Sequence, residues 1–183
     1  MLKQVLLAIF MACCALPACA GEPTKPQPKV GDIPPPLLGK KHGGDEINLE
    51  QYRGKVVIVT FWASWCGPCR KELPVLAHFQ KVVGRDALEV IAVNYKEPRQ
   101  DFLGMLRANR KLEMTYVHDG KGIASDAYGV QALPNMFVID RDGRVAHVHR
   151  GYDESMLEGF IEEILALLPA DVLKRPANVQ RSP

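Results

Sequence analysis

The pattern of apolar and polar positions predicts alternating strands and helices over most of the chain. Two apolar runs rich in β-branched residues, at residues 56–61 and 88–93, are typical of buried strands. Between them, residues 68–83 place apolar side chains at helical intervals, and Gly84 supplies a stop signal. A strand, a helix and a second strand in this order predict a βαβ unit whose strands pair in parallel.

The flanking segments complete a mixed α/β pattern over residues 37–168, which we predict to be one domain. Asp153 is placed to cap the last helix, and Pro169 to end it. Residues 169–183 are predicted to be a disordered tail. The other predicted elements are a small hairpin at 37–49, a helix at 97–109, a short strand at 112–117, a short helix at 123–128 and a strand pair at 135–139 and 144–149.

The first 20 residues have the pattern of a cleaved signal peptide. Lys3 precedes an apolar run that is too short to span a bilayer. Two cleavage patterns fit: Ala18-Cys19-Ala20 is a small-residue peptidase site, whereas residues 16–19 resemble a bacterial lipoprotein box with a lipid on Cys19. Either one predicts export, to the periplasm, with a lipid anchor in the membrane in the second case. Residues 21–36, rich in proline, are then an extended tether.

Composition narrows the function classes. The net charge is +2, and both signs are mixed along the chain, which argues against a nucleic-acid surface. Of the five cysteines, only Cys66 and Cys69 lie outside the leader segment. A lone cysteine pair in an oxidising compartment becomes oxidised unless electrons are supplied, so export implies an electron-donating partner.

Cys66-Gly67-Pro68-Cys69 lies where the first apolar strand gives way to a helix. Free N–H groups and the helix dipole stabilise a thiolate there, which makes Cys66 the predicted exposed attacker. Cys69, one turn later and directed inward, would resolve the mixed disulfide. A zinc site would need more ligands, and no second Cys pair or His-x₃₋₅-His follows. A structural disulfide across so short a loop would constrain the unfolded chain little, so a redox role is favoured.

Residues 61–72 resemble the active-site segment of thioredoxin-like proteins, and more narrowly that of the exported TlpA/ResA/DsbE branch, which reduces disulfides outside the cytoplasm. Further matches lie at 54–60, 128–134 and 137–144, and the resemblance spans roughly residues 30–168. It implies a three-layer α/β/α fold whose central mixed sheet is preceded by an N-terminal hairpin and contains a central insertion.

The resemblance also implies roles for further residues. Pro134 would be cis beside the cysteines and would free the Leu133 backbone to pair with a substrate peptide. Glu72 would tune the thiols and relay a proton to Cys69, because Thr60 stands where thioredoxins carry a buried Asp; a solvated surface glutamate is the alternative. From its place directly before Cys66, rather than from the resemblance, Trp65 is predicted to offer a flat apolar face to partners, with core packing as the alternative; core packing is the prediction for Trp62.

A reductive direction is favoured by the dipeptide between the cysteines, since Gly-Pro is the thioredoxin type. Thioredoxin lies about 150 mV below the strong oxidant DsbA, roughly 7 kcal/mol for two electrons. The resemblance implies protein substrates, either apocytochrome c haem-site cysteines or copper-site cysteines, and a membrane electron donor of the DsbD/CcdA kind.

Two other functions are weaker predictions. A periplasmic copper-binding chaperone would use Cys66 and Cys69, although chaperones of related fold usually space their cysteines more widely. A thiol peroxidase would need a Pro-x₃-Thr-x₂-Cys context, which is absent. His147 and His149 share a strand face, but two ligands do not make a usual metal site. We therefore expect no metal and no cofactor.

Overall fold

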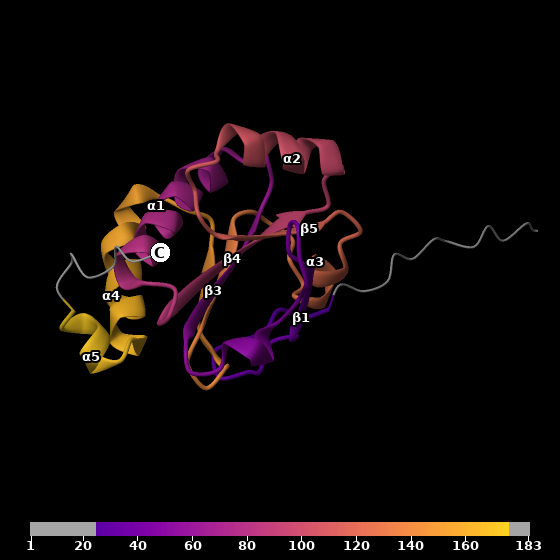
Figure 1. Cartoon of the computed structure of the whole chain (residues 1–183). Coiled ribbons are helices and arrows are strands. Elements are labelled where there is room, and N and C mark those ends of the chain that lie inside the picture. Colours follow the sequence, from indigo (N-terminus) through magenta and orange to yellow (C-terminus); the bar gives the residue numbers. More distant parts are fainter. Residues whose placement is uncertain (1–24, 176–183) are drawn as a thin grey trace, which may run out of the picture.

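The computed structural model describes residues 25–175. A five-stranded mixed sheet lies at its centre (Figure 1). The strand order is β5-β4-β3-β6-β7. The parallel pairs are β3 with β4 and β4 with β5, whereas β6 pairs antiparallel with both β3 and β7. The predicted βαβ unit is thus confirmed. The strands are β3 (Val56–Trp62), β4 (Leu88–Tyr95), β5 (Thr115–Asp119), β6 (Asn135–Ile139) and β7 (Val145–Arg150).

Helices and a hairpin cover the two faces of the sheet and confirm the predicted three layers. One apolar core joins the sheet to α1, α2 and α4, and the other joins it to α3 and the hairpin of β1 and β2. Figure 1 shows α1 and α4 beside each other, with β1 and α3 away from them. The elements are α1 (Gly67–Val83), α2 (Arg99–Ala108), α3 (Ile123–Ala127), α4 (Leu157–Leu167), β1 (Leu37–Lys40), β2 (Glu46–Asn48) and the 3₁₀ turn η1 (Leu49–Tyr52).

The central strand β3 is buried along its whole length because it contributes to both cores. Successive side chains of a strand point to opposite faces, so Ile58 packs on the helical side and Val59 on the hairpin side. This explains why the sequence here is a continuous apolar run rather than an alternating one. Such a strand is a rigid support for whatever follows its carboxyl end.

Three predicted boundaries move. The strand expected at 112–117 begins later, because residues 109–112 form a turn in which the Leu112 N–H donates to the Asn109 carbonyl. The helix expected from residue 97 begins at Arg99, after Pro98. The last helix is preceded by the 3₁₀ turn η2 (Glu154–Met156), which Asp153 caps by accepting the Ser155 N–H.

The prediction of an extended tether at residues 21–36 is wrong for residues 25–36, because this segment is hydrogen-bonded to the domain. The Gly31 N–H donates to the Val145 carbonyl at 2.8 Å, and the Val145 N–H donates to the backbone carbonyl of Asp32 at 2.9 Å. The Tyr128 hydroxyl donates to the Pro35 carbonyl at 2.9 Å. Proline removes N–H groups but leaves carbonyls that accept, so a proline-rich strap can still be hydrogen-bonded.

The predicted disordered tail is also corrected in its first part. Residues 170–173 form α5 (Ala170–Leu173), and Val172 is buried in the core on the helical side of the sheet. The proline that ends one helix therefore starts the next, as proline suits a helix N-terminus. The leader at residues 1–20, including Cys19, and the last residues, 176–183, lie outside the described residues.

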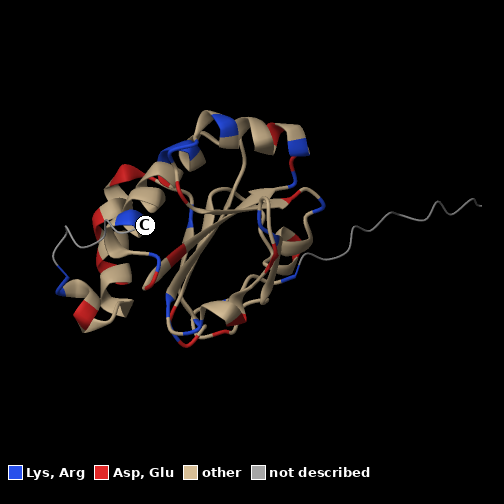
Figure 2. Ribbon diagram, in the orientation of Figure 1, with Lys and Arg blue, Asp and Glu red and all other residues tan. Residues whose placement is uncertain are grey.

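Charged residues of both signs are spread over the helices and loops (Figure 2). In the described part of the chain, no helix is long and apolar enough to cross a membrane.

Candidate active site

The cysteine pair lies at the junction of β3 and α1. Cys66 is the N-cap residue of α1, Pro68 lies in the first turn, and the two cysteines are joined by a disulfide. The Cys69 N–H donates to Cys66 Sγ at 3.2 Å, so an otherwise unpaired amide of the helix end points at the first sulfur. This geometry would stabilise a Cys66 thiolate after reduction.

The predicted exposures of the two cysteines are right for Cys69 and wrong for Cys66. Cys69 is fully buried, as predicted for the resolving cysteine, but Cys66 is only 5% exposed and is not an open surface residue in the disulfide form. The disulfide holds Cys66 against the helix end, so that a reacting partner reaches it over a small area.

Glu72 lies one turn after Cys69 and is 1% exposed, so the alternative of a solvated surface glutamate is wrong. Thr60 Oγ1 donates to Glu72 Oε2 at 2.7 Å. Burial raises the pKa of Glu72 to about 7, against the smaller opposing effect of the Thr60 hydrogen bond. At neutral pH this carboxyl is therefore divided between its protonated and ionised forms.

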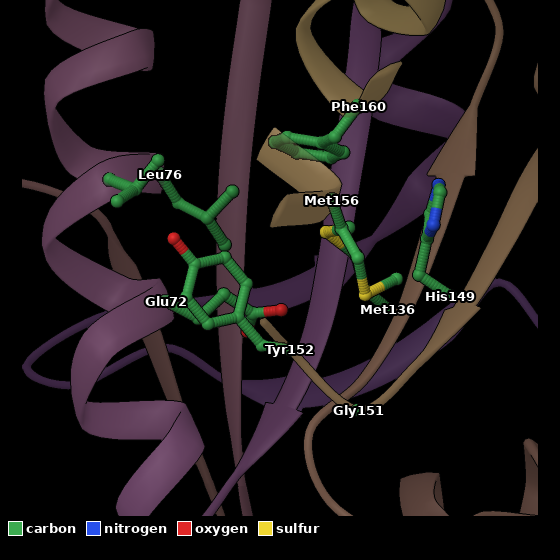
Figure 3. A pocket seen from close by; sticks show the side chains of 9 residues that line it. Glu72, Leu76, Met136, His149, Gly151, Tyr152, Met156 and Phe160 are labelled. Carbon is green, nitrogen blue, oxygen red and sulfur yellow. The ribbon is translucent and has the colours of Figure 1, made fainter. Parts of the chain in front are cut away.

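A small apolar pocket lies beside Glu72 (Figure 3). The ring of Tyr152 lies next to Glu72, while two methionine side chains approach from β6 and from η2. Sequence analysis missed these residues because they are far from the cysteines in the chain. The pocket is lined by Glu72, Leu76, Met136, Tyr152, Met156 and Phe160, among others.

The Leu133–Pro134 peptide bond is cis, as predicted. Pro134 leads directly into β6, where Asn135 is the register partner of Phe61, so the proline lies at the same end of the sheet as the cysteine pair. The Gly151 N–H donates to the Pro134 carbonyl at 2.8 Å. That contact ties the pocket loop to the cis-proline loop.

The two tryptophans near the cysteines have opposite environments. Trp62 is fully buried, which confirms its predicted core position, whereas Trp65 is 66% exposed. An exposed indole next to Cys66 is available for contact with another protein. Leu133 is half-buried and packs against both cores.

The two histidines of β7, His147 and His149, stack on each other, and both also contact the carboxylate of Glu163. His149 Nε2 lies 2.7 Å from Glu163 Oε2, and His147 Nδ1 lies 3.5 Å from the same atom. These contacts join β7 to α4. Within residues 25–175, no group of three or more His, Cys, Asp or Glu side chains is arranged to hold a metal ion.

A cysteine pair at a helix N-terminus, with a cis-proline at the start of a neighbouring strand, places this molecule among the thioredoxin-like thiol–disulfide oxidoreductases. The chain belongs to the Redoxin family, whose model matches residues 20–162.

Individual relatives agree with this class. The chain is 33% identical over 124 residues to the thiol-disulfide oxidoreductase ResA of Geobacillus thermodenitrificans, covering 67% of this chain and 70% of that protein. It is 30% identical over 138 residues to ResA of Bacillus subtilis, covering 75% of each. The protein is accordingly an enzyme, a thiol–disulfide oxidoreductase of the ResA/DsbE type.

Solved structures confirm the fold. A Chlorobium tepidum protein described as a thiol:disulfide interchange protein DsbE superposes with a TM-score of 0.71 at 33% identity, covering 77% of this chain and 99% of that one. The pneumococcal exposed lipoprotein thioredoxin Etrx1 from Streptococcus pneumoniae has a TM-score of 0.60 at 26% identity, covering 70% and 96%.

Proposed function

We propose that the protein is an exported reductase of protein disulfides, and that its substrates are apocytochrome c haem-site cysteines or copper-site cysteines. The observation that carries the proposal is a buried carboxyl, Glu72, one turn from the resolving Cys69. The thioredoxin-type Gly67-Pro68 dipeptide supports the reductive direction.

The reaction moves two electrons to the substrate. The Cys66 thiolate attacks one substrate sulfur, so that a mixed disulfide forms and the other substrate sulfur leaves as a thiolate. Cys69 then attacks Cys66 Sγ, the mixed disulfide breaks, and the second substrate thiol is released. The Cys66–Cys69 disulfide found in the structure is the product state of this cycle.

Cys69 must lose its proton before it can attack, and Glu72 is the proposed acceptor. Its pKa of about 7 suits proton exchange at neutral pH, because both protonation states are populated. Thr60 holds one carboxyl oxygen and leaves the other to take the proton.

Substrate peptides would pair with the backbone at Leu133, next to the cis Pro134, and contact the exposed Trp65. These three residues come from two separate segments but lie at the carboxyl end of β3. They would recognise an extended peptide around a disulfide rather than one particular fold.

The oxidised pair must be reduced again, so we propose a membrane electron donor of the DsbD/CcdA kind. A lipid on Cys19 would hold the protein at the membrane surface, near that donor. The name of the pneumococcal relative, an exposed lipoprotein, supports the proposed lipid anchor.

Trapping of mixed disulfides tests the substrate. In Cys69→Ser the mixed disulfide on Cys66 cannot be resolved, so substrates should accumulate as covalent complexes in the periplasm. Cys66→Ser with Cys69→Ser is the control, because it keeps the fold and cannot form them. If the trapped complexes contain neither cytochrome precursors nor copper-protein precursors, the proposed substrates are wrong.

A further inference from the structure

A second buried carboxylate contacts the turn that carries Cys66. Glu97 follows β4 and is 5% exposed. Its Oε2 accepts the Ser64 backbone N–H at 2.8 Å, and its Oε1 accepts the Ser64 hydroxyl at 2.6 Å. Both donors of Ser64 therefore end on one side chain. Sequence analysis placed Glu97 in a predicted helix and assigned it no role.

Glu97 is itself held by two neighbouring strands. Asn94, fully buried on β4, donates its side-chain amide to Glu97 Oε2. His118 on β5 places Nε2 2.8 Å from the Glu97 backbone carbonyl oxygen. Because both residues belong to the sheet, the carboxylate is a fixed point and not a mobile surface group.

Ser64 and Cys66 share one turn. The Cys66 N–H donates to the Ala63 carbonyl at 3.1 Å, and Arg70 on α1 reaches the Ser64 carbonyl at 3.5 Å. The position of Cys66 at the end of α1 therefore depends on where Ser64 is held. In the disulfide form the bond to Cys69 also fixes Cys66, but after reduction that constraint is lost.

We propose that Glu97 is a positioning residue for thiol–disulfide exchange. Its carboxylate holds the turn of residues 63–66 so that, after reduction, the Cys66 sulfur stays at the N-terminus of α1. The proposal rests on exchange at Cys66, but not on the reductive direction or on any substrate of the proposed function.

The test measures how fast iodoacetamide alkylates reduced Cys66 at a series of pH values, in the Cys69→Ser background. This rate follows the fraction of Cys66 that is a thiolate. Glu97→Gln replaces one acceptor oxygen by an N–H₂ group, so the Ser64 hydroxyl must accept where it now donates, and the negative charge that strengthens the contacts of Ser64 and Asn94 is lost. We expect the Cys66 pKa to rise and alkylation at pH 7 to slow about three- to tenfold, where tenfold is one pKa unit. Ser64→Ala, which loses only the hydroxyl contact, should slow it in the same direction by less.

Glu89→Gln is the matched control. Glu89 is 4% exposed, lies at the other end of β4 and accepts from Thr115 at 2.6 Å, so its loss perturbs the same strand away from the cysteines. It should lower stability and leave the alkylation rate unchanged.

Three outcomes would overturn the proposal: unchanged alkylation in Glu97→Gln and Ser64→Ala, an equal slowing in Glu89→Gln, or faster alkylation in Glu97→Gln. The last would mean that Cys66 responds to the negative charge of Glu97 and not to its hold on the turn. If Glu97→Gln does not fold, Ser64→Ala decides, since it removes one hydroxyl from a half-buried residue. Alkylation needs no protein substrate, so failure of the proposed reductase function would be seen separately.

Discussion

Thr60 and Glu72 form a buried hydrogen bond across the junction of β3 and α1, with 2.7 Å between Oγ1 and Oε2. Both side chains are at most 1% exposed. A hydroxyl of this kind does not titrate at ordinary pH, so the proton-carrying group at this buried site is the helical carboxyl.

Glu72→Gln should change how stability depends on pH. The pKa of Glu72 is about 7 in the folded protein and about 4.5 in the unfolded chain, so between these values the folded state binds more protons. Stability from this group is therefore fully present below pH 4.5 and is lost as pH rises through 7, by up to about 3 kcal/mol. Urea denaturation from pH 4.5 to 8 should show a flatter profile for Glu72→Gln. An unchanged slope would show that Glu72 is not buried as described.

Thr60→Val should weaken the protein more at pH 8 than at pH 5. The valine keeps the shape but removes the donor, and a hydrogen bond to an ionised group contributes about 1.5–3 kcal/mol. The Glu72 pKa should rise further, which ¹³C NMR of labelled glutamate can follow. Thr60→Val in the Glu72→Gln background supplies the control, because the amide at position 72 does not ionise and the loss should then be the same at both pH values. Equal losses at both pH values for Thr60→Val alone would contradict the assignment.

Trp65→Ala should separate protein reduction from small-molecule reduction. The side chain is 66% exposed, so stability should change by less than about 0.5 kcal/mol. Insulin reduction should fall severalfold because the apolar contact surface is lost, whereas reduction of a small aromatic disulfide should not. Ile123→Ala is a matched control, since Ile123 is 73% exposed on α3. If both variants lose the same activity, Trp65 has no special part in recognition.

The reduction potential of the Cys66–Cys69 pair should lie closer to about −270 mV than to about −120 mV. Equilibration with glutathione or with a thioredoxin of known potential measures it. A potential near about −120 mV would contradict the reductive direction, because the Cys66–Cys69 disulfide would then oxidise its partners.

The strap formed by residues 25–36 should contribute to stability. A chain that starts at residue 37 loses the hydrogen bonds that Gln27, Gly31, Asp32, Pro35 and Pro36 make to the domain, of which those that are not on the surface contribute about 1 kcal/mol each. We expect a loss of about 2–4 kcal/mol against a chain that starts at residue 25, measured by urea denaturation. Equal stability of the two chains would restore the simple tether predicted from composition.

Much of the site was predictable because its signals are local. The apolar run of β3, the Cys-x-x-Cys spacing and Pro68 follow one another in the chain, so the strand, the helix start and the cysteine pair are encoded together. The parallel pairing of β3 with β4 followed from the helix between them. The cis form of Pro134 and the role predicted for Glu72 came only from the family resemblance, and the burial of Glu72 came only from the structure, since helical spacing alone fits a solvated glutamate equally well.

The sequence by itself determined the order of the elements and the positions of the reacting sulfurs, because periodicity and short motifs act over a few residues. Only the tertiary structure decided which polar groups share a buried environment. Glu97 reaches Ser64 across 33 residues, and Gln27 reaches Gly129 across 102. Such contacts leave no periodic trace in the chain, because they depend on how the sheet brings distant loops to one edge.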